Sequence, residues 1–261
     1  LDFVFENLYN QELNKTPKDF IKKKHFDRIY FRLFEVFDST SNYKKLIESE
    51  KVFLNNEELK NLPELFFELI SLDGLEEIVN PKYLVNIHGD LHFQNILMSE
   101  DHESFILADP RGEIEGSDLY YDMGKLWHSV NGLYDFIHTN QFTLKSEFKN
   151  GYSHNHIEFI NPEKYKLYKD LEKFLEKNIL SYKTIYEDNY YIENILFNEA
   201  IHFCSVMTFH LNRYGDELRS TAMYLSGIKL LNDFLKLDSI KSLKTKKYNH
   251  FNLKDQYDFI N

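Results

Sequence analysis

Apolar residues recur at intervals of three and four over most of the chain, a spacing that places them on one face of an α-helix. The longest stretches with this pattern cover residues 2–38, 164–180, 191–211 and 216–237. Thr16-Pro17 interrupts the first stretch, so we expect a second helix to start there, with Thr16 as its N-cap. Shorter helices are expected over residues 43–50, 56–59 and 63–72.

The pattern changes between residues 83 and 108, where short apolar runs alternate with polar turns. Residues 83–87 predict a short strand, and residues 95–98 and 104–108 predict two strands of a hairpin. A helix is expected to follow from Asp118. The pattern therefore predicts an α+β protein that is mostly α-helical and carries one short hairpin.

We expect one domain overall, built from four consecutive parts. These are a helical opening (1–82), a loop and hairpin (83–127), a helical part (128–240) and a tail (241–261).

Composition narrows the possible partners. The formal charge of -11 argues against a nucleic-acid partner, because phosphate backbones require a basic face. Cys204 is the single cysteine, so no intrachain disulfide can form and a reducing compartment fits. No stretch approaches a membrane span and no signal peptide is visible, so we expect a cytoplasmic protein without a membrane partner.

One stretch combines polar residues that suit a specific chemistry. It reads His88-Gly89-Asp90-Leu91-His92-Phe93-Gln94-Asn95, and the second strand of the predicted hairpin then ends at Asp109. Phosphoryl transfer to a hydroxyl needs a carboxylate that orients or deprotonates the hydroxyl, and oxygen ligands for Mg²⁺. Protein kinases place these groups in a loop H-R-D-L-x-x-x-N and in an acid that ends the next strand. Asp90, Asn95 and Asp109 have that arrangement.

Residues 83–127 resemble the C-terminal lobe of the aminoglycoside phosphotransferase and choline kinase family, kinase-like enzymes that phosphorylate small molecules. In that family the loop carries HGD, as in His88-Gly89-Asp90. The resemblance implies a protein-kinase-like C-lobe with Asp90 as catalytic base and with Asn95 and Asp109 as Mg²⁺ ligands. It also implies ATP or GTP as phosphoryl donor and a small-molecule hydroxyl of aminoglycoside, choline or sugar type as acceptor.

Three further residues receive roles from the same resemblance. His88 would organise the loop as a buried, hydrogen-bonded histidine, and His92 would either contact the transferred phosphate or pack. The segment from Asp118 to Leu126 is similar to the family's D-P-x-Y-D-L-A helix start, which implies that Asp122 braces the loop through backbone N–H groups. Asp118 is expected to cap the helix.

The chain departs from the family in two places. Arg111 follows Asp109 where a second acid or phenylalanine-glycine is usual, and it would either bind a substrate anion or pair with Glu113 or Glu115. Residues 1–87 show no alternating strands, no glycine-rich loop and no A-x-K strand, so the nucleotide-binding N-lobe is not recognisable. Either that lobe lies upstream of Leu1, which we favour, or nucleotide binding is unconventional. The chain from Leu1 to Asn261 alone would then lack the lobe that binds ATP and could be inactive.

A substrate pocket in this fold would lie between the loop and the C-terminal helices. His210 and Arg213 are candidates for lining it, although a core histidine and an arginine at a helix C-terminus explain the pattern better.

Two other functions stay open. His88, Asp90 and His92 alternate, and with Asp109 they could hold Zn²⁺ or Mn²⁺ in a metal-dependent hydrolase, although Gly89 favours a loop over a strand. A non-catalytic kinase-like binding module would explain the unrecognised N-lobe and Arg111.

Overall fold

The computed structural model describes residues 1–37, 39–111 and 115–245. The α+β class is confirmed, and with about 56% of the chain in helices the protein is mostly helical. The helices are α1 (Asp2–Asn7), η1 (Lys22–Phe26, a π-helical segment), α2 (Asp27–Phe37), α3 (Ser41–Glu48), α4 (Leu62–Ser71), α5 (Leu75–Val79), η2 (Phe93–Asn95, a 3-10 turn), α6 (Leu119–Val130), α7 (Tyr134–His138), α8 (Pro162–Ile179), α9 (Lys183–Tyr186), α10 (Tyr191–Tyr214), α11 (Glu217–Phe234) and α12 (Asp238–Lys241).

The strands are short and fall into small sheets. They are β1 (Glu12–Lys15), β2 (Lys51–Leu54), β3 (Glu57–Leu59), β4 (Leu72–Asp73), β5 (Tyr83–Val85), β6 (Ile96–Met98), β7 (Phe105–Leu107), β8 (Phe142–Lys149), β9 (Tyr152–Phe159) and β10 (Lys244–Thr245). No helix within the described ranges is long and apolar enough to cross a membrane.

The predicted long helices form, and their starts are capped as their sequences indicate. Asp118 accepts a hydrogen bond from the Tyr120 N–H at the start of α6, and Asp216 accepts one from the Arg219 N–H at the start of α11. Thr16 is an exception, because its hydroxyl donates to the Pro81 carbonyl at 2.6 Å. The helix that we expected at Thr16 begins instead at residue 20, after the strand β1.

Three predictions of secondary structure were wrong. The helix expected over residues 56–59 is instead the strand β3 (Glu57–Leu59), and β1, β2 and β4 form within the first 82 residues, where we expected no strands. Residues 142–159 are the hairpin β8–β9, which joins β2 and β3 in a sheet of order β3-β2-β9-β8. Asn150 and Gly151 both have positive φ (54° and 81°) at the turn of this hairpin. An Asn-Gly turn between alternating residues favours a hairpin over a helix.

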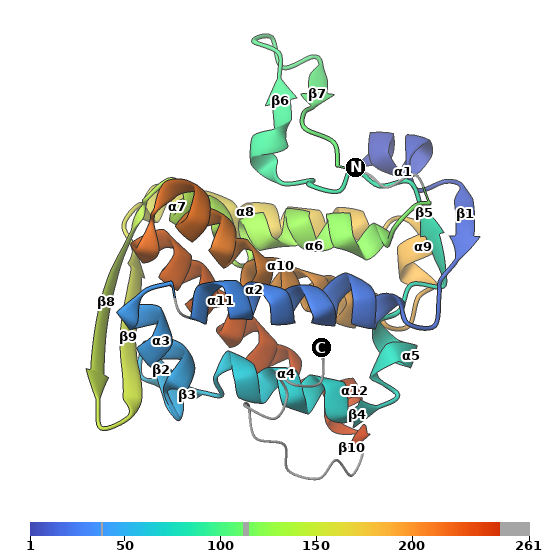
Figure 1. Ribbon diagram of the computed structural model, residues 1–261. Coiled ribbons are helices and arrows are strands. Elements are labelled where there is room, and N and C mark those ends of the chain that lie inside the picture. Colours follow the sequence, from blue (N-terminus) through green and yellow to red (C-terminus); the bar gives the residue numbers. More distant parts are fainter. Residues whose placement is uncertain (38, 112–114, 246–261) are drawn as a thin grey trace.

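α6 lies on the side of the helical body that faces the β6–β7 hairpin and packs against α10 (Figure 1). The two helices approach closely at Gly124, where an added Cβ would lie only 2.7 Å from Cβ of Asn198 and 2.8 Å from the backbone nitrogen of Glu199. α6 is buried along nearly its whole length. Side chains that project from its N-terminal half are therefore held rigidly against the loop that precedes the β6–β7 hairpin.

The β6–β7 hairpin projects away from the helical body (Figure 1). Its strands pair antiparallel with Ile96 opposite Leu107, as the sequence predicted. The segment 86–95 runs between β5 and this hairpin, and β5 is anchored by antiparallel pairing with β1. The loop of interest is therefore fixed at one end by a small sheet and at the other by the hairpin.

Candidate functional site

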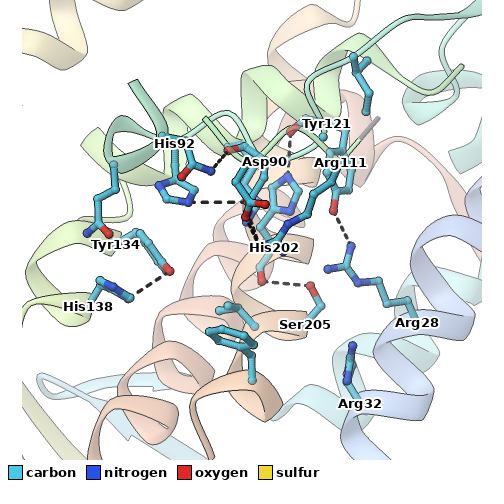
Figure 2. A pocket seen from close by; sticks show the side chains of 18 of the residues that line it. Arg28, Arg32, Asp90, His92, Arg111, Tyr121, Tyr134, His138, His202 and Ser205 are labelled. Atoms are coloured by element: carbon cyan, nitrogen blue, oxygen red, sulfur yellow. Dashed lines mark hydrogen bonds and ion pairs between the residues drawn. The ribbon is translucent and has the colours of Figure 1, made fainter. Parts of the chain in front are cut away.

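A cavity of about 700 Å³ opens beside the 88–95 loop. Its walls come from η1 and α2 on one side, from the loop, the end of β7 and α6 above, and from α7 and α10 on the remaining sides (Figure 2). Asp90, His92, Asn95, Asp109 and Arg111 all line it, so the structure brings together most of the residues that the sequence selected. Its volume lies in the range of small-molecule sites.

Asp122 holds the loop in place from below. Its carboxylate is fully buried and accepts hydrogen bonds from the backbone N–H of His88 at 2.7 Å and of Gly89 at 2.8 Å. The Tyr9 hydroxyl donates a third bond at 2.9 Å. Burial raises the pKa of Asp122, and these three donors oppose that shift. Asp122 thus makes backbone contacts of the kind that the family resemblance implied for it.

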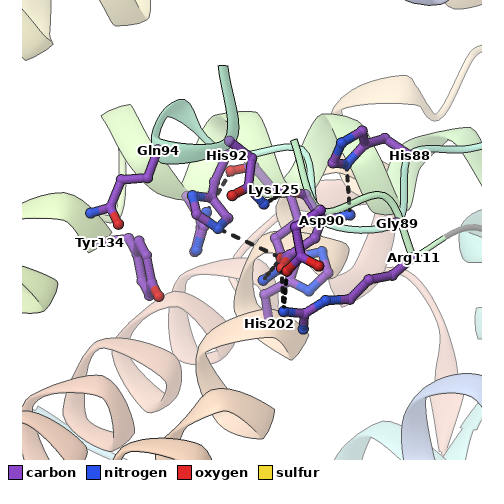
Figure 3. Close-up of polar contacts among 12 residues, drawn as sticks. His88, Gly89, Asp90, His92, Gln94, Arg111, Lys125, Tyr134 and His202 are labelled. Carbon is purple, nitrogen blue, oxygen red and sulfur yellow. Dashed lines mark hydrogen bonds and ion pairs between the residues drawn. The ribbon is translucent and has the colours of Figure 1, made fainter. Parts of the chain in front are cut away.

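Glycine is required at the second position of the loop. Gly89 has φ +82°, a conformation that side chains with Cβ rarely adopt. This turn lets two consecutive N–H groups point at one carboxylate and directs the next side chain, Asp90, into the cavity (Figure 3).

Asp90 lies among three cationic or polar groups. Its Oδ1 is 3.0 Å from Lys125 Nζ and 3.8 Å from His92 Nε2, and its Oδ2 is 3.3 Å from an Arg111 nitrogen (Figure 3). Burial acts to raise the pKa of Asp90, but the charge and hydrogen bond of Lys125, helped by His92 and Arg111, outweigh it and lower the pKa. The carboxylate is therefore ionised at neutral pH and has two oxygens fixed in direction.

Lys125 was not selected from the sequence, although it is the nearest cation to Asp90. It sits three residues after Asp122 on α6, and side chains with this spacing share one face of a helix. That spacing was the signal that could have identified it. Its side chain is only 10% exposed, so its pairing with Asp90 is shielded from water.

Asn95 and Asp109 offer oxygen ligands at the same cavity. The Asn95 amide nitrogen donates to the Asp90 backbone carbonyl at 2.8 Å, so its Oδ1 is the atom that can ligate a cation. Asp109 adopts φ +53° just after β7, and its side chain is 60% exposed. Mg²⁺ in nucleotide sites commonly takes one or two protein oxygens and fills its shell with phosphates and water. Asn95 and Asp109 offer oxygens of this type, and the Asp109 carboxylate is bonded to Arg111.

Arg111 connects the end of the hairpin to the loop. Its backbone N–H donates to the His88 carbonyl, and its guanidinium bonds to Asp109 at 2.7 Å besides approaching Asp90. It therefore does not use Glu115, and Glu113 lies outside the described residues. The guanidinium bridges the two carboxylates that the resemblance assigns to base and metal ligand.

The two histidines of the loop differ in their environments. His88 is buried and its Nδ1 accepts a hydrogen bond from the Asp90 N–H at 3.3 Å. His92 lines the cavity, and burial, followed by the charge of Lys125, lowers its pKa to about 4. His92 is therefore neutral at physiological pH and can contact a phosphate only as a neutral hydrogen-bond donor. In the part of the chain that the structure describes, no group of three or more His, Cys, Asp or Glu side chains is placed to hold a metal ion.

The two candidates on α10, His210 and Arg213, differ in whether they line the cavity. Arg213 lines the cavity, whereas His210 is fully buried and does not. Side chains from outside the loop that the sequence did not single out also line it, notably Arg28 of α2 and Tyr121 of α6. Arg28 donates to the Tyr121 hydroxyl at 2.8 Å. Only folding brings α2 to this place, because 93 residues separate the two partners.

Comparison of the chain with protein-family models, with curated proteins and with solved structures gave no match.

Proposed function

We propose that this protein transfers the γ-phosphoryl group of ATP or GTP to a hydroxyl of a small molecule, with Mg²⁺ as cofactor and a fold of the kinase-like C-lobe type. One observation carries the proposal. An ionised Asp90 is fixed on the cavity wall by a loop whose N–H groups bind Asp122, and Asn95 bonds to the carbonyl of the same Asp90.

Asp90 is the residue that would act on the acceptor. Its carboxylate accepts a hydrogen bond from the acceptor hydroxyl and takes its proton as the new O–P bond forms and the bond to the leaving nucleoside diphosphate breaks. A lowered pKa makes Asp90 a weak base, which suits a loose transition state where proton removal comes late. Orientation of the hydroxyl is then its main contribution.

The neighbouring residues support that carboxylate. Lys125 keeps Asp90 ionised and directs its Oδ1, while Asp122 and Gly89 fix the backbone beneath it. His92 is within reach of the same space and, being neutral, donates a hydrogen bond to a phosphoryl oxygen. Asn95 and Asp109 would hold Mg²⁺, which when bound neutralises the phosphate charge that develops during transfer.

The proposal is tested with the full-length protein and a panel of hydroxyl-bearing acceptors, measuring release of nucleoside diphosphate. Asp90→Asn keeps the shape of the side chain and removes its charge, so we expect turnover to fall by roughly 10²-fold or more. Mg-nucleotide affinity should change by less than about threefold, because Asp90 faces the acceptor. Asp170→Asn on the exposed face of α8 is the matched control and should keep full activity.

Unchanged turnover in Asp90→Asn would rule out this assignment. Absence of any acceptor-dependent turnover in the unmodified full-length protein would reject the transferase proposal itself.

One observation favours a second candidate, a non-catalytic binding module. Arg111 already bonds to Asp109 and lies 3.3 Å from Asp90, so its guanidinium competes with a metal ion for Asp109 and with an acceptor hydroxyl for Asp90. If the full-length protein shows no stabilisation by Mg-nucleotide in a thermal unfolding assay, the binding module is the better description. For the metal-hydrolase alternative, stoichiometric zinc in the purified protein would be the supporting result.

A further inference from the structure

The walls of the cavity carry the opposite charge from the chain as a whole. Seven lysine or arginine side chains line it against two aspartates, in a protein whose formal charge is -11. The cationic residues are Lys23, Lys24, Arg28, Arg32, Arg111, Lys125 and Arg213. Two of them pair with these aspartates, Arg111 with Asp109 and Lys125 with Asp90. The other five lie on η1, α2 and the end of α10, and we call this group the basic wall. Within it, Lys23 pairs with Asp19 at 2.6 Å and Lys24 lies 5.4 Å from the centre of the Tyr121 ring.

The basic wall faces the loop across the cavity. Arg28 and Arg32 are four residues apart on α2, which places them on one face of that helix. Figure 2 shows both reaching toward the cavity on the side opposite His92 and Tyr134. On that side Arg28 lies below Tyr121 and Arg111, the residue whose guanidinium bonds to Asp109.

Two of the arginines are held in place without an acidic partner. Arg28 bonds to the Tyr121 hydroxyl and lies 5.9 Å from the centre of that ring. Arg213 lies over the rings of Phe209 and Tyr214, at 5.2 Å and 5.5 Å. Across the described ranges, neither guanidinium forms an ion pair with a carboxylate. Arg32 differs because it pairs with Glu35 at 2.8 Å.

Such an arrangement suits an anionic ligand. Like charges gathered along one wall repel each other, and an anion with several oxygens relieves that repulsion. Guanidinium groups bind phosphate through two parallel hydrogen bonds, and aromatic faces hold them in a fixed orientation without neutralising them. A cationic acceptor such as an aminoglycoside or choline would meet repulsion at the same wall.

We propose that the acceptor of this enzyme is itself anionic, a small polyhydroxyl compound that already carries a phosphate, with Arg28 and Arg213 binding that phosphate while a free hydroxyl faces Asp90. This inference rests on the proposed function for the transfer step, but binding of the phosphorylated acceptor is measured separately from transfer. The volume of about 700 Å³ accommodates a molecule of that size.

The experiment measures equilibrium binding to the full-length protein by titration calorimetry, without nucleotide. The probes are glucose 6-phosphate and inorganic phosphate, compared with glucose and with the aminoglycoside kanamycin. The variants are Arg28→Gln, Arg213→Gln and their combination. Lys166→Gln, an exposed lysine on α8 outside the cavity, is the control for loss of one positive charge.

We expect both phosphate-bearing probes to bind, glucose 6-phosphate more tightly than glucose by roughly tenfold or more, and kanamycin to bind no better than glucose. Each arginine substitution should weaken binding of the phosphate compounds by about tenfold, and Lys166→Gln should leave it unchanged. Arg28→Lys should recover only part of the loss, because an ammonium cannot make the paired hydrogen bonds.

Several outcomes would overturn the inference. They are absence of binding by both phosphate probes, equal binding of glucose or kanamycin, and insensitivity to the double substitution. A further one is a loss of Mg-ATP affinity in the double variant as large as the loss for glucose 6-phosphate, since the basic wall would then serve the nucleotide. If the binding results hold but no transfer is found, the anion site stands and the proposed function fails.

Discussion

Asp122 offers the sharpest test of how the loop is held, and the test does not depend on the proposed activity. The carboxylate is fully buried and accepts three hydrogen bonds, from the N–H groups of His88 and Gly89 and from the Tyr9 hydroxyl. Asp122→Ala leaves three buried donors without an acceptor. Each such donor costs about 1–3 kcal/mol, and because the cavity left behind admits some relaxation we expect a total loss on the order of 4 kcal/mol.

The loss is measured by denaturant unfolding and by thermal unfolding, where it corresponds to a decrease in Tm of roughly 10 °C. Hydrogen exchange gives the local readout. The amide protons of His88 and Gly89 should lose their protection, because Asp122 is their acceptor. Asp170→Ala, an exposed acid on α8, is the control and should cost less than about 0.5 kcal/mol.

A loss below about 1 kcal/mol in Asp122→Ala, with the amides of the loop still protected, would refute the reasoning. It would mean that the β1–β5 pairing and the hairpin hold the loop by themselves.

Three further predictions concern other parts of the molecule. Burial raises the pKa of Glu199 to about 8 from an ordinary 4.5, so the folded state favours the protonated carboxyl. The stability that this preference contributes is fully present below pH 4.5 and is lost as the pH rises to about 8. Glu199→Gln should remove this decrease in the free energy of unfolding, on the order of 4 kcal/mol, in unfolding curves collected between pH 5 and 8.5. Gly124→Ala should destabilise the protein by about 2–3 kcal/mol, measured by denaturant unfolding, because the added Cβ would meet the α10 backbone at 2.8 Å. Arg111→Ala should raise the apparent affinity for Mg²⁺ or Mn²⁺ by about tenfold in a metal titration with nucleotide, because a competing cation leaves Asp109.

Each of these has a contradicting result. A pH profile of Glu199→Gln parallel to that of the unmodified protein would show that Glu199 does not titrate in this range. An unchanged stability of Gly124→Ala would show that α6 and α10 separate at little cost. Unaltered or weaker metal binding in Arg111→Ala would show that the guanidinium does not compete for the metal ligands.

The local structure around the loop could be predicted from the sequence because its signals are short-range. The hairpin over residues 96–107 follows from two apolar runs around a polar turn, and the cap at Asp118 follows from one residue before a helix. The contact between Asp122 and the loop was also anticipated, although through a family resemblance and not through spacing.

The hairpin β8–β9 shows where the interpretation of local pattern failed. Phe142, Leu144 and Phe148 alternate with polar residues, and Asn150-Gly151 follows, which together indicate a hairpin. The longer helical stretches on either side dominate the apolar pattern of this region. The parallel pairing of β9 with β2 could not have been predicted in any case, because about 100 residues separate the two strands.

What the sequence determined by itself is a short set of groups: the carboxylate of Asp90 with the Gly89 turn that directs it, Asn95 on the same loop, and Asp109 after the hairpin. These residues lie within 21 positions of one another, and turn and strand preferences act over such distances. Only the tertiary structure decided which charged side chains line the cavity in front of them. Lys125 reaches Asp90 from inside a buried helix, and Arg28 and Arg213 arrive from elements at opposite ends of the chain. These side chains meet at the cavity because of how the helices pack around α6, and local sequence patterns do not predict that packing.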